Sequence, residues 1–199
     1  MSQQEFWNGK FSRDGYLYGT KPNAFISSKI ELLTRKTRVL CLGEGEGRNA
    51  IFFAKNDFIV TAMDASDVGL SKLHFRSIEE NIKIETICLD LNEWNVSEKF
   101  DVIVASYLHM YKNERESLFD KIENSLYKDG YFIGEFFSTK QIDYNSGGPK
   151  DLELLYTIED FENHFKSCKK EISEEIVSLD EGKGHQGLAC VIRVVIQKV

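Results

Sequence analysis

Residues 39–50 have the sequence Val39-Leu40-Cys41-Leu42-Gly43-Glu44-Gly45-Glu46-Gly47-Arg48-Asn49-Ala50. An apolar run is followed by three alternating glycines, which predicts a buried strand, a tight loop and then the start of a helix. Glycine lets the backbone turn sharply and lets a ligand approach it, and the first turn of a helix offers unpaired N–H groups that suit a carboxylate or a phosphate. Taken alone, a purely structural glycine turn explains this loop at least as well as a ligand does.

Short apolar runs rich in β-branched residues recur along the chain. They predict five buried strands, at 38–42, 59–63, 84–89, 100–105 and 131–136. Segments with helical periodicity lie between these strands, at 48–55, 67–81 and 113–127. Strand alternating with helix predicts an α/β fold with a mostly parallel sheet, right-handed crossovers and helices on both faces.

The last third of the chain departs from this rhythm. A helix is expected to start at Thr157, which has Asp160 three residues later. Residues 170–179 and 188–196 predict two strands joined by the turn-rich stretch 180–187, and so short a connection makes them antiparallel. The chain is therefore expected to form one domain, residues 1–199.

Composition narrows the classes of function. The chain has 199 residues, enough for one core, and a formal net charge of −7. Nucleic acid is a poor candidate partner because phosphates are bound mainly by Lys and Arg. No apolar run has the length of a membrane span, and Met1–Glu5 lacks the features of a signal peptide, so we expect a cytoplasmic protein, monomeric or homodimeric, without a membrane partner.

The four cysteines are far apart in the sequence and form no C-x-x-C pair. They are Cys41, Cys88, Cys168 and Cys190. Each lies in or beside an apolar stretch, which favours reduced, buried thiols over a metal site. No metal is expected.

Two acids end the second and third predicted strands. Asp64 lies about twenty residues after the loop, where a carboxylate can accept hydrogen bonds from both ribose hydroxyls. Asp64 as a helix cap is the alternative, which is less favoured because Ser66 or Asp67 can provide that cap. Asp90 can reach the exocyclic amine of an adenine, with Leu91 against the ring, or it can simply form a turn. Three strand ends at one crevice predict an adenosyl ligand.

A dinucleotide is the alternative ligand, and it would indicate an NAD-dependent oxidoreductase. The spacing here is G-x-G-x-G, so the third glycine of the dinucleotide pattern G-x-G-x-x-G falls on Arg48. A large side chain there disfavours the close helix–strand packing that the pattern provides. One domain also leaves little room for a second domain that binds a hydride acceptor. NAD is therefore the weaker interpretation.

Segments spread over nearly the whole chain resemble the class I methyltransferases related to the tellurite-resistance (TehB-type) enzymes and, more distantly, the thiopurine methyltransferases. The segments are 6–25, 44–50, 144–151 and 179–187. The resemblance implies a Rossmann-like, seven-stranded, mostly parallel sheet of order 3-2-1-4-5-7-6 with the last strand antiparallel. It also implies S-adenosylmethionine as cofactor, S-adenosylhomocysteine as product, and a lid formed by residues 1–25, although burial against the core explains the aromatic side chains there equally well.

This chain departs from the resembling enzymes at one position. Many class I enzymes carry an acid two residues before the first glycine, where Cys41 stands here. Glu44, Glu46 or backbone carbonyls would then hold the methionyl ammonium. The candidate cofactor-binding residues are Gly43, Glu44, Gly45, Gly47, Asn49, Asp64, Ala65, Ser66, Asp90, Leu91, Ala105 and Tyr18.

Methyl transfer from a sulfonium is an in-line displacement, for which a protein mainly supplies alignment and a dry pocket. Because no inserted recognition domain is visible, we expect a small-molecule acceptor, such as a thiol or a chalcogen oxyanion. A non-catalytic module that binds S-adenosylmethionine on the same fold is the alternative class.

The acceptor site is expected after the fourth and fifth strands, where the connection 138–156 is either functional or an ordinary surface loop. His185, in a glycine-rich turn, is the candidate catalytic residue, with simple exposure as the alternative. The candidate substrate contacts are Tyr107, His109, Tyr144 and Arg13.

Overall fold

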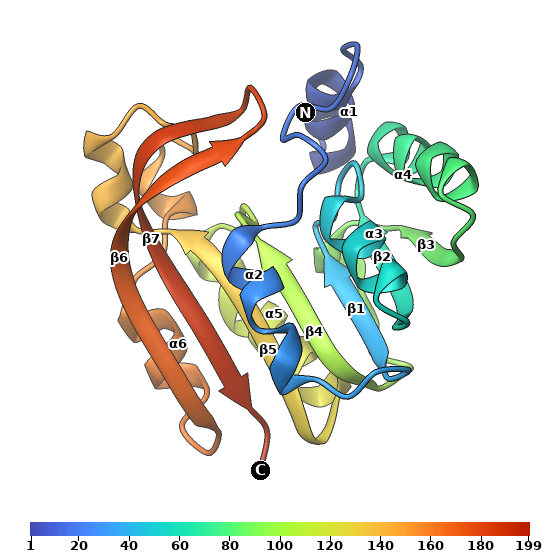
Figure 1. Ribbon diagram of the computed structural model, residues 1–199. Helices are drawn as coiled ribbons and strands as arrows, with labels where there is room; N and C mark the ends of the chain where they lie inside the picture. Colours follow the sequence, from blue (N-terminus) through green and yellow to red (C-terminus); the bar gives the residue numbers. More distant parts are fainter.

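A computed structural model describes residues 1–199, and one seven-stranded sheet forms its centre (Figure 1). Its order is β3-β2-β1-β4-β5-β7-β6. The pairs among β1 to β5 are parallel, whereas β7 is antiparallel to both β5 and β6. The predicted strand order and the antiparallel last strand are confirmed. The strands are β1 (Arg38–Leu42), β2 (Ile59–Asp64), β3 (Ile84–Cys88), β4 (Phe100–Ser106), β5 (Leu126–Phe137), β6 (Lys169–Glu181) and β7 (His185–Gln197).

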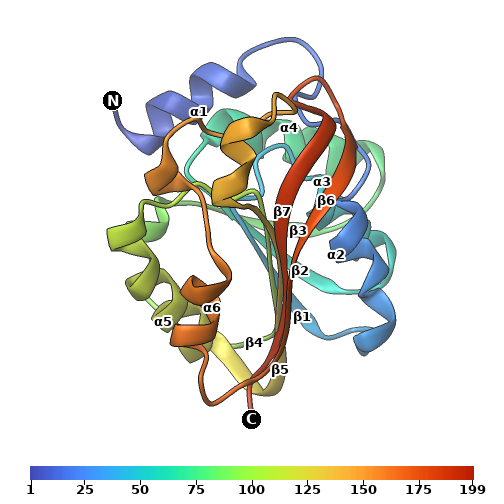
Figure 2. The same ribbon diagram turned by 90° about the vertical axis from the view of Figure 1, so that its left-hand side faces the viewer.

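Helices cover both faces of the sheet (Figure 2). One face carries α2 (Ala24–Ser28), α3 (Arg48–Lys55) and α4 (Asp67–Glu79), and the other carries α5 (Arg115–Ser125) and α6 (Ile158–His164). The first helix, α1 (Gln3–Phe11), lies outside these layers, beside α4 and across the edge where the parallel strands end. Short 3-10 helices complete the chain: η1 (Ile30–Leu32), η2 (Leu91–Glu93), η3 (Lys112–Glu114), η4 (Thr139–Asp143) and η5 (Leu152–Leu154).

Two apolar cores hold the layers together. The core under α5 and α6 contains 21 buried residues and includes Phe132 and the tilted ring pair of Phe119 and Phe161. The core under α2, α3 and α4 contains 15 buried residues, among them Ile51 and Leu73. Packing on both faces holds the strands, and therefore their ends, in fixed positions. In an open α/β sheet, ligands bind at these strand ends.

The hairpin of β6 and β7 is longer than the sequence predicts. The expected turn at 180–187 is only Gly182–Gly184, and the residues on either side continue the antiparallel pairing as far as Glu181 and His185. Gly182 adopts φ +62°, and the N–H of Gly184 donates to the carbonyl of Leu17 at 3.0 Å. Turn-forming residues therefore marked the region correctly, but contacts with the N-terminal segment extend the strands.

Other boundaries also shift. The helix expected at 113–127 is divided into η3 and α5, and β5 starts at Leu126 rather than at 131, with an irregular register against β4 between Phe100 and Val102. The expectation of buried thiols is met by Cys41 and Cys190 but is wrong for Cys88, which is exposed.

Two features bear on partners and cofactors. No helix combines the length and the apolarity that crossing a bilayer requires. No group of three His, Cys, Asp or Glu side chains is placed to hold a metal ion.

Candidate functional site

The loop after β1 has a backbone that only glycine adopts easily. Gly43, Gly45 and Gly47 have φ values of +58°, +58° and +90°. A Cβ on Gly47 would lie 2.3 Å from the Cδ1 of Leu73, and one on Gly45 would lie 2.8 Å from the Phe11 ring. The alternating glycines therefore let α4 and α1 approach the loop from both sides.

Glu44 caps the helix that follows the loop. Its Oε1 accepts hydrogen bonds from the N–H groups of Asn49 (2.8 Å) and Ala50 (2.7 Å) in the first turn of α3. Burial raises the pKa of Glu44 to about 7. The expectation that the start of this helix offers free N–H groups to an anion is wrong for these two amides, because the protein's own carboxylate occupies them.

Asp64 joins the loop to the next helix. Its Oδ2 accepts from the N–H of Gly45 at 2.8 Å, and its Oδ1 accepts from the N–H of Ser66 at 2.7 Å. Ser66 is the N-cap of α4, so Asp64 does not serve as that cap. Burial raises the pKa of Asp64 to about 6. A buried carboxylate is thus fixed at the end of β2.

A cleft lies at the carboxyl ends of β1 to β4. Asp90 lines it while its Oδ1 accepts from the N–H of Asn92 at 2.9 Å, so the residue forms a turn as well as facing the cleft. Most predicted residues line this cleft: Gly43, Glu44, Gly45, Gly47, Asp64, Ala65, Asp90, Leu91, Tyr18, Tyr107, His109 and His185.

Five predicted residues lie elsewhere. Asn49 lies beside the cleft and has a structural role. Its side-chain amide accepts a hydrogen bond from the N–H of Asn23 and donates one to the hydroxyl of Ser106. Ser66 caps α4, Ala105 is buried within β4, and Tyr144 ends η4 away from the cleft. Arg13 lines a second, outer pocket that adjoins the cleft.

The N-terminal segment forms one wall of the cleft. Trp7 stacks on Phe11 with ring centroids 5.6 Å apart and lies 5.2 Å from the ring of His109. Asn8 ties α1 to α4, because its amide donates to Asp67 at 2.7 Å and accepts from the hydroxyl of Ser66 at 2.6 Å. Phe11 is buried, and it also lines the cleft with Trp7.

His185 is a buried strand residue rather than an exposed turn residue. It begins β7, its side chain is almost fully buried, and its ring lies 4.4 Å from the Tyr18 ring and 4.5 Å from the Tyr107 ring. Its Nδ1 is 3.5 Å from the Oε2 of Glu181. Burial lowers the pKa of His185, with Glu181 opposing the shift.

His109 lies on the same side of the cleft after β4. Burial, followed by the charge of His185, lowers the pKa of His109 to about 4. At neutral pH both histidines are therefore neutral and weakly basic.

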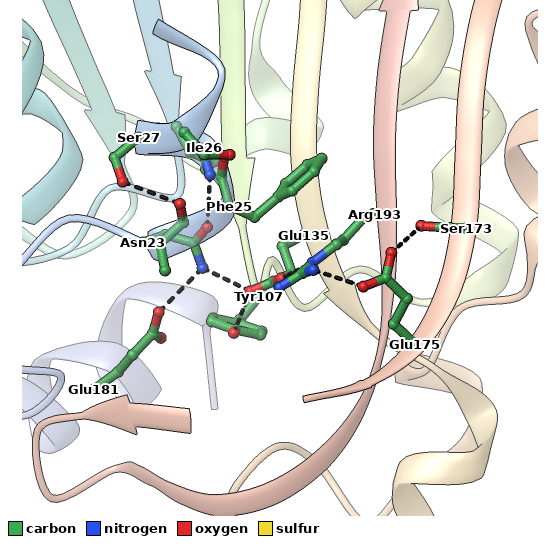
Figure 3. A network of polar contacts seen from close by, with 12 residues as sticks. Asn23, Phe25, Ile26, Ser27, Tyr107, Glu135, Ser173, Glu175, Glu181 and Arg193 are labelled. Atoms are coloured by element: carbon green, nitrogen blue, oxygen red, sulfur yellow. Dashed lines mark hydrogen bonds and ion pairs between the residues drawn. The ribbon is translucent and has the colours of Figure 1, made fainter. Parts of the chain in front are cut away.

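Beneath the cleft lies a buried polar network (Figure 3). Glu135, on β5, accepts from the hydroxyl of Tyr107 (2.6 Å), the amide of Asn23 (2.8 Å) and the Nε of Arg193 (2.6 Å). The Asn23 amide also donates to Glu181, which forms an ion pair with Arg48 at 2.8 Å.

Because the Tyr107 hydroxyl donates to Glu135, the Tyr107 ring, rather than its hydroxyl, faces the cleft. Sequence reasoning missed Arg193 and the role of Asn23. The available signal was the pair of opposite charges, Glu135 and Arg193, inside two otherwise apolar strands; these residues are register partners in the sheet.

Sequence comparison relates the chain to a described family. Residues 11–141 match the family model of the tellurite resistance protein TehB. A probable S-adenosyl-L-methionine-dependent methyltransferase TehB of Haemophilus influenzae (strain ATCC 51907 / DSM 11121 / KW20 / Rd) is 33% identical over 87 residues, which are 44% of this chain and 30% of that protein. A putative methyltransferase of Geobacillus sp. (strain WCH70) is 26% identical over 128 residues, 61% of this chain and 51% of that protein. The match thus spans about a third to a half of the length of these relatives.

Solved structures share the fold. The crystal structure of TehB from Haemophilus influenzae superposes with a TM-score of 0.75 at 18% identity, covering 100% of this chain and 68% of that one. The N-methyltransferase NodS from Bradyrhizobium japonicum WM9, in complex with S-adenosyl-L-homocysteine, superposes with a TM-score of 0.73 at 10% identity, covering 100% and 99%. At these identities the likeness identifies the class I methyltransferase fold.

Proposed function

We propose that this chain, which belongs to the family of the tellurite resistance protein TehB, transfers the methyl group of S-adenosylmethionine to a small-molecule acceptor in the cytoplasm. The similarity to a probable methyltransferase and the position of the cleft at the strand ends support this proposal. A thiol or a chalcogen oxyanion is the proposed acceptor type.

The charge of the cleft is the observation that carries the proposal. Four carboxyl groups line the cleft, those of Glu44, Glu46, Asp64 and Asp90, against one guanidinium, that of Arg48. S-adenosylmethionine carries a sulfonium and an ammonium, whereas NAD carries a pyrophosphate. Since Glu44 already occupies the start of α3, a pyrophosphate there would meet the Glu44 carboxyl group instead of the free N–H groups of Asn49 and Ala50. The cleft therefore favours a cationic ligand over a dinucleotide.

Different residues of the cleft are proposed to hold the adenosyl end and the methionyl end of S-adenosylmethionine. Asp64 is buried at the place proposed for the ribose, and Asp90 with Leu91 is proposed for the adenine. Arg48 is the cation proposed to hold the methionyl carboxylate. Glu46 is committed elsewhere, because its carboxylate accepts from the N–H of Leu17 and pairs with Lys72, both at 2.7 Å. Backbone carbonyls of the loop are therefore proposed to hold the ammonium.

When bound, the cofactor supplies an electrophilic methyl group on a sulfonium. The chain supplies a water-excluding wall, made by Trp7, Tyr107 and Met110, and two weak bases. His185 is proposed to take the acceptor's proton, with Glu181 orienting its ring. Because its pKa is lowered, His185 suits an acceptor that ionises readily, such as a thiol, better than an alcohol.

Residues 1–25 are proposed to act as a lid. Trp7 and Tyr18 line the cleft from this segment, and exposed polar contacts hold residues 13–15 to α4. The Nζ of Lys72 donates to the carbonyls of Arg13 (2.8 Å) and Gly15 (2.6 Å). Such exposed hydrogen bonds can break and reform without disturbing the apolar cores.

Calorimetric titration tests the cofactor. The wild type is expected to bind S-adenosylmethionine, and Asp64→Ala is expected to lose that binding. Asp57→Ala is the control, since this exposed acid lies away from the cleft. A wild type that binds no cofactor would contradict the proposal.

A second experiment tests transfer. Labelled S-adenosylmethionine is offered with thiols, selenite and tellurite, and products are identified by mass spectrometry. Transfer to at least one acceptor is expected. Cofactor binding without transfer to any of them would favour the non-catalytic binding module on the same fold.

A further inference from the structure

We propose that the acceptor is a small organic anion, whose acidic group is held by Lys10, Arg13 and Lys183 while its nucleophile reaches the cofactor cleft. The inference rests on the proposed methyl transfer and adds the substrate class. It comes from the outer pocket, which adjoins the proposed cofactor cleft.

The outer pocket opens directly onto the cleft. It has a volume of about 540 Å³ and shares with the cleft the residues Gln3, Trp7, Tyr18, His109 and His185. An acceptor that enters it therefore meets both histidines and the aromatic wall on its way to the methyl group. The pocket is bounded by α1, by the tip of the β6–β7 hairpin and by the connection 138–156.

The connection 138–156 reaches the hairpin because of a glycine. Gly147 adopts φ +123°, and a Cβ there would lie 2.4 Å from the carbonyl oxygen of Gly184 and 2.5 Å from the His185 ring. This contact brings Gly148 and Pro149 into the pocket wall. The Gly147-Gly148-Pro149 stretch thus closes the outer pocket rather than forming a free surface loop.

The charge of the outer pocket is opposite to that of the cleft. Lys10, Arg13, Lys183 and the terminal amine of Met1 line it, and no Asp or Glu does, although the chain carries a net charge of −7. None of these four cations takes part in an ion pair; Lys10 lies over the Phe6 ring, with its Nζ 5.4 Å from the centroid. By contrast, Lys72 and Lys140 are each neutralised by a glutamate.

The unpaired cations of the outer pocket and the acids of the cleft attract ligands of opposite charge. A cationic cofactor is attracted to the inner cleft, and an anion is attracted to the outer pocket and repelled from the inner one. The methyl group then lies at the boundary of the two compartments.

The size and lining of the outer pocket indicate an organic body. Phe6, Trp7, Tyr111, Pro149 and Leu154 supply apolar surface, and Phe6 and Tyr111 are 41% and 43% exposed. An inorganic oxyanion of a few atoms would leave this surface in water, whereas pockets of several hundred Å³ typically enclose organic ligands. An apolar group carrying a carboxylate would use both the aromatic faces and the cations.

The reaction then balances without another reactant. The bond between the sulfonium sulfur and the methyl carbon breaks, and its electron pair stays on that sulfur. A bond forms between the methyl carbon and the acceptor thiolate, and the thiol proton passes to His185 or to water. The acceptor's carboxylate is unchanged and remains with the cations.

The test compares two thiols, 4-mercaptophenylacetate and its methyl ester, of which only the first carries a carboxylate. Methyl transfer is measured with the wild type, Lys10→Gln, Lys183→Gln and the double variant. Lys83→Gln is the control, because this exposed lysine lines neither pocket. In parallel, calorimetry follows the binding of phenylacetate and of its amide to the cofactor-saturated protein, which needs no turnover.

We expect the wild type to have a lower KM for the acid than for the ester. Each lysine substitution should raise the KM for the acid roughly two- to fivefold, as loss of an exposed charge pair does, with kcat unchanged and the ester unaffected. Phenylacetate should bind more tightly than its amide, and the double variant, which keeps Arg13, should reduce that difference. Lys83→Gln should match the wild type.

Equal KM values for acid and ester, equal binding of phenylacetate and amide, or an unchanged preference in the double variant would overturn the inference. Turnover of selenite or tellurite with no turnover of either thiol would overturn its organic part. In these cases the proposed methyl transfer still stands. A wild type that binds no S-adenosylmethionine would instead reject the proposed function.

Discussion

The two carboxylates that hold Arg193 allow a matched test of the buried network. Glu135 is 2% exposed and accepts three hydrogen bonds, whereas the side chain of Glu175 is 42% exposed and pairs with the same arginine at 2.7 Å. Glu135→Gln keeps the shape but removes the charge, and its new NH2 group faces either the donors of Asn23 and Tyr107 or the Nε of Arg193. Glu175→Gln makes the same chemical change at an exposed position.

The expected costs differ because the environments differ. Removing one partner of a fully buried ion pair costs about 3–5 kcal/mol. The Arg193 side chain is 23% exposed and keeps Glu175, so we expect Glu135→Gln to lower the free energy of unfolding by about 2–3 kcal/mol. An exposed pair contributes about 0–1 kcal/mol, so Glu175→Gln should cost less than about 1 kcal/mol.

Urea denaturation of both variants and the wild type measures these values from the transition midpoint and slope. The wild-type slope should be retained, since the surface exposed on unfolding is unchanged. Equal destabilisation by the two substitutions, or a loss below about 1 kcal/mol for Glu135→Gln, would refute the view that Glu135 is the centre of the network.

Three further outcomes follow from the loop and its acids. Gly47→Ala should destabilise the protein by about 2–4 kcal/mol in thermal or urea unfolding, because φ is +90° and the new methyl would lie 2.3 Å from Leu73; a change within about 0.5 kcal/mol would contradict the tight contact. Calorimetric affinity for S-adenosylmethionine should rise between pH 5 and pH 8, because the pKa values of Asp64 and Glu44 are about 6 and about 7 and a cation prefers their ionised forms; a flat profile would count against an acid-lined cofactor site. In the absence of the cofactor, the stability of the protein changes with pH in the opposite direction to the cofactor affinity. The native state holds these protons to higher pH than the unfolded chain does, so their contribution to stability is lost as pH rises from about 4 to about 7, and Glu44→Gln should show less of this loss in urea titrations at pH 5 and pH 7.5.

The sheet could be predicted from the sequence because its signals are local. Each strand contains a short apolar run, and each strand end near the cleft carries its own marker, such as the glycines after β1 or Asp64 at the end of β2. Parallel strands place all their carboxyl ends at one edge, so residues that are far apart in sequence could be assigned to one cleft without knowing any distance.

The error at His185 arose from a non-local cause. Three glycines, at 182, 184 and 187, favoured a wide turn, but Gly187 adopts φ +103° within β7. The hairpin tip is held by Leu17 and surrounded by the rings of Tyr18 and Tyr107. These contacts come from residues more than 70 positions away, so composition around the turn could not predict that His185 is buried.

The position of Cys41 can be understood from the same buried charge. Glu44 caps α3 with a carboxylate that is almost fully buried, and burial together with the charge of Glu44 raises the pKa of the Cys41 thiol. An acid at position 41 would place a second carboxyl group against the first in an apolar environment, and one of the two would have to remain protonated. A small neutral side chain avoids that repulsion. The departure at Cys41 and the helix cap at Glu44 are thus two parts of one arrangement, in which the acid that faces the loop comes from the loop itself instead of from the strand before it.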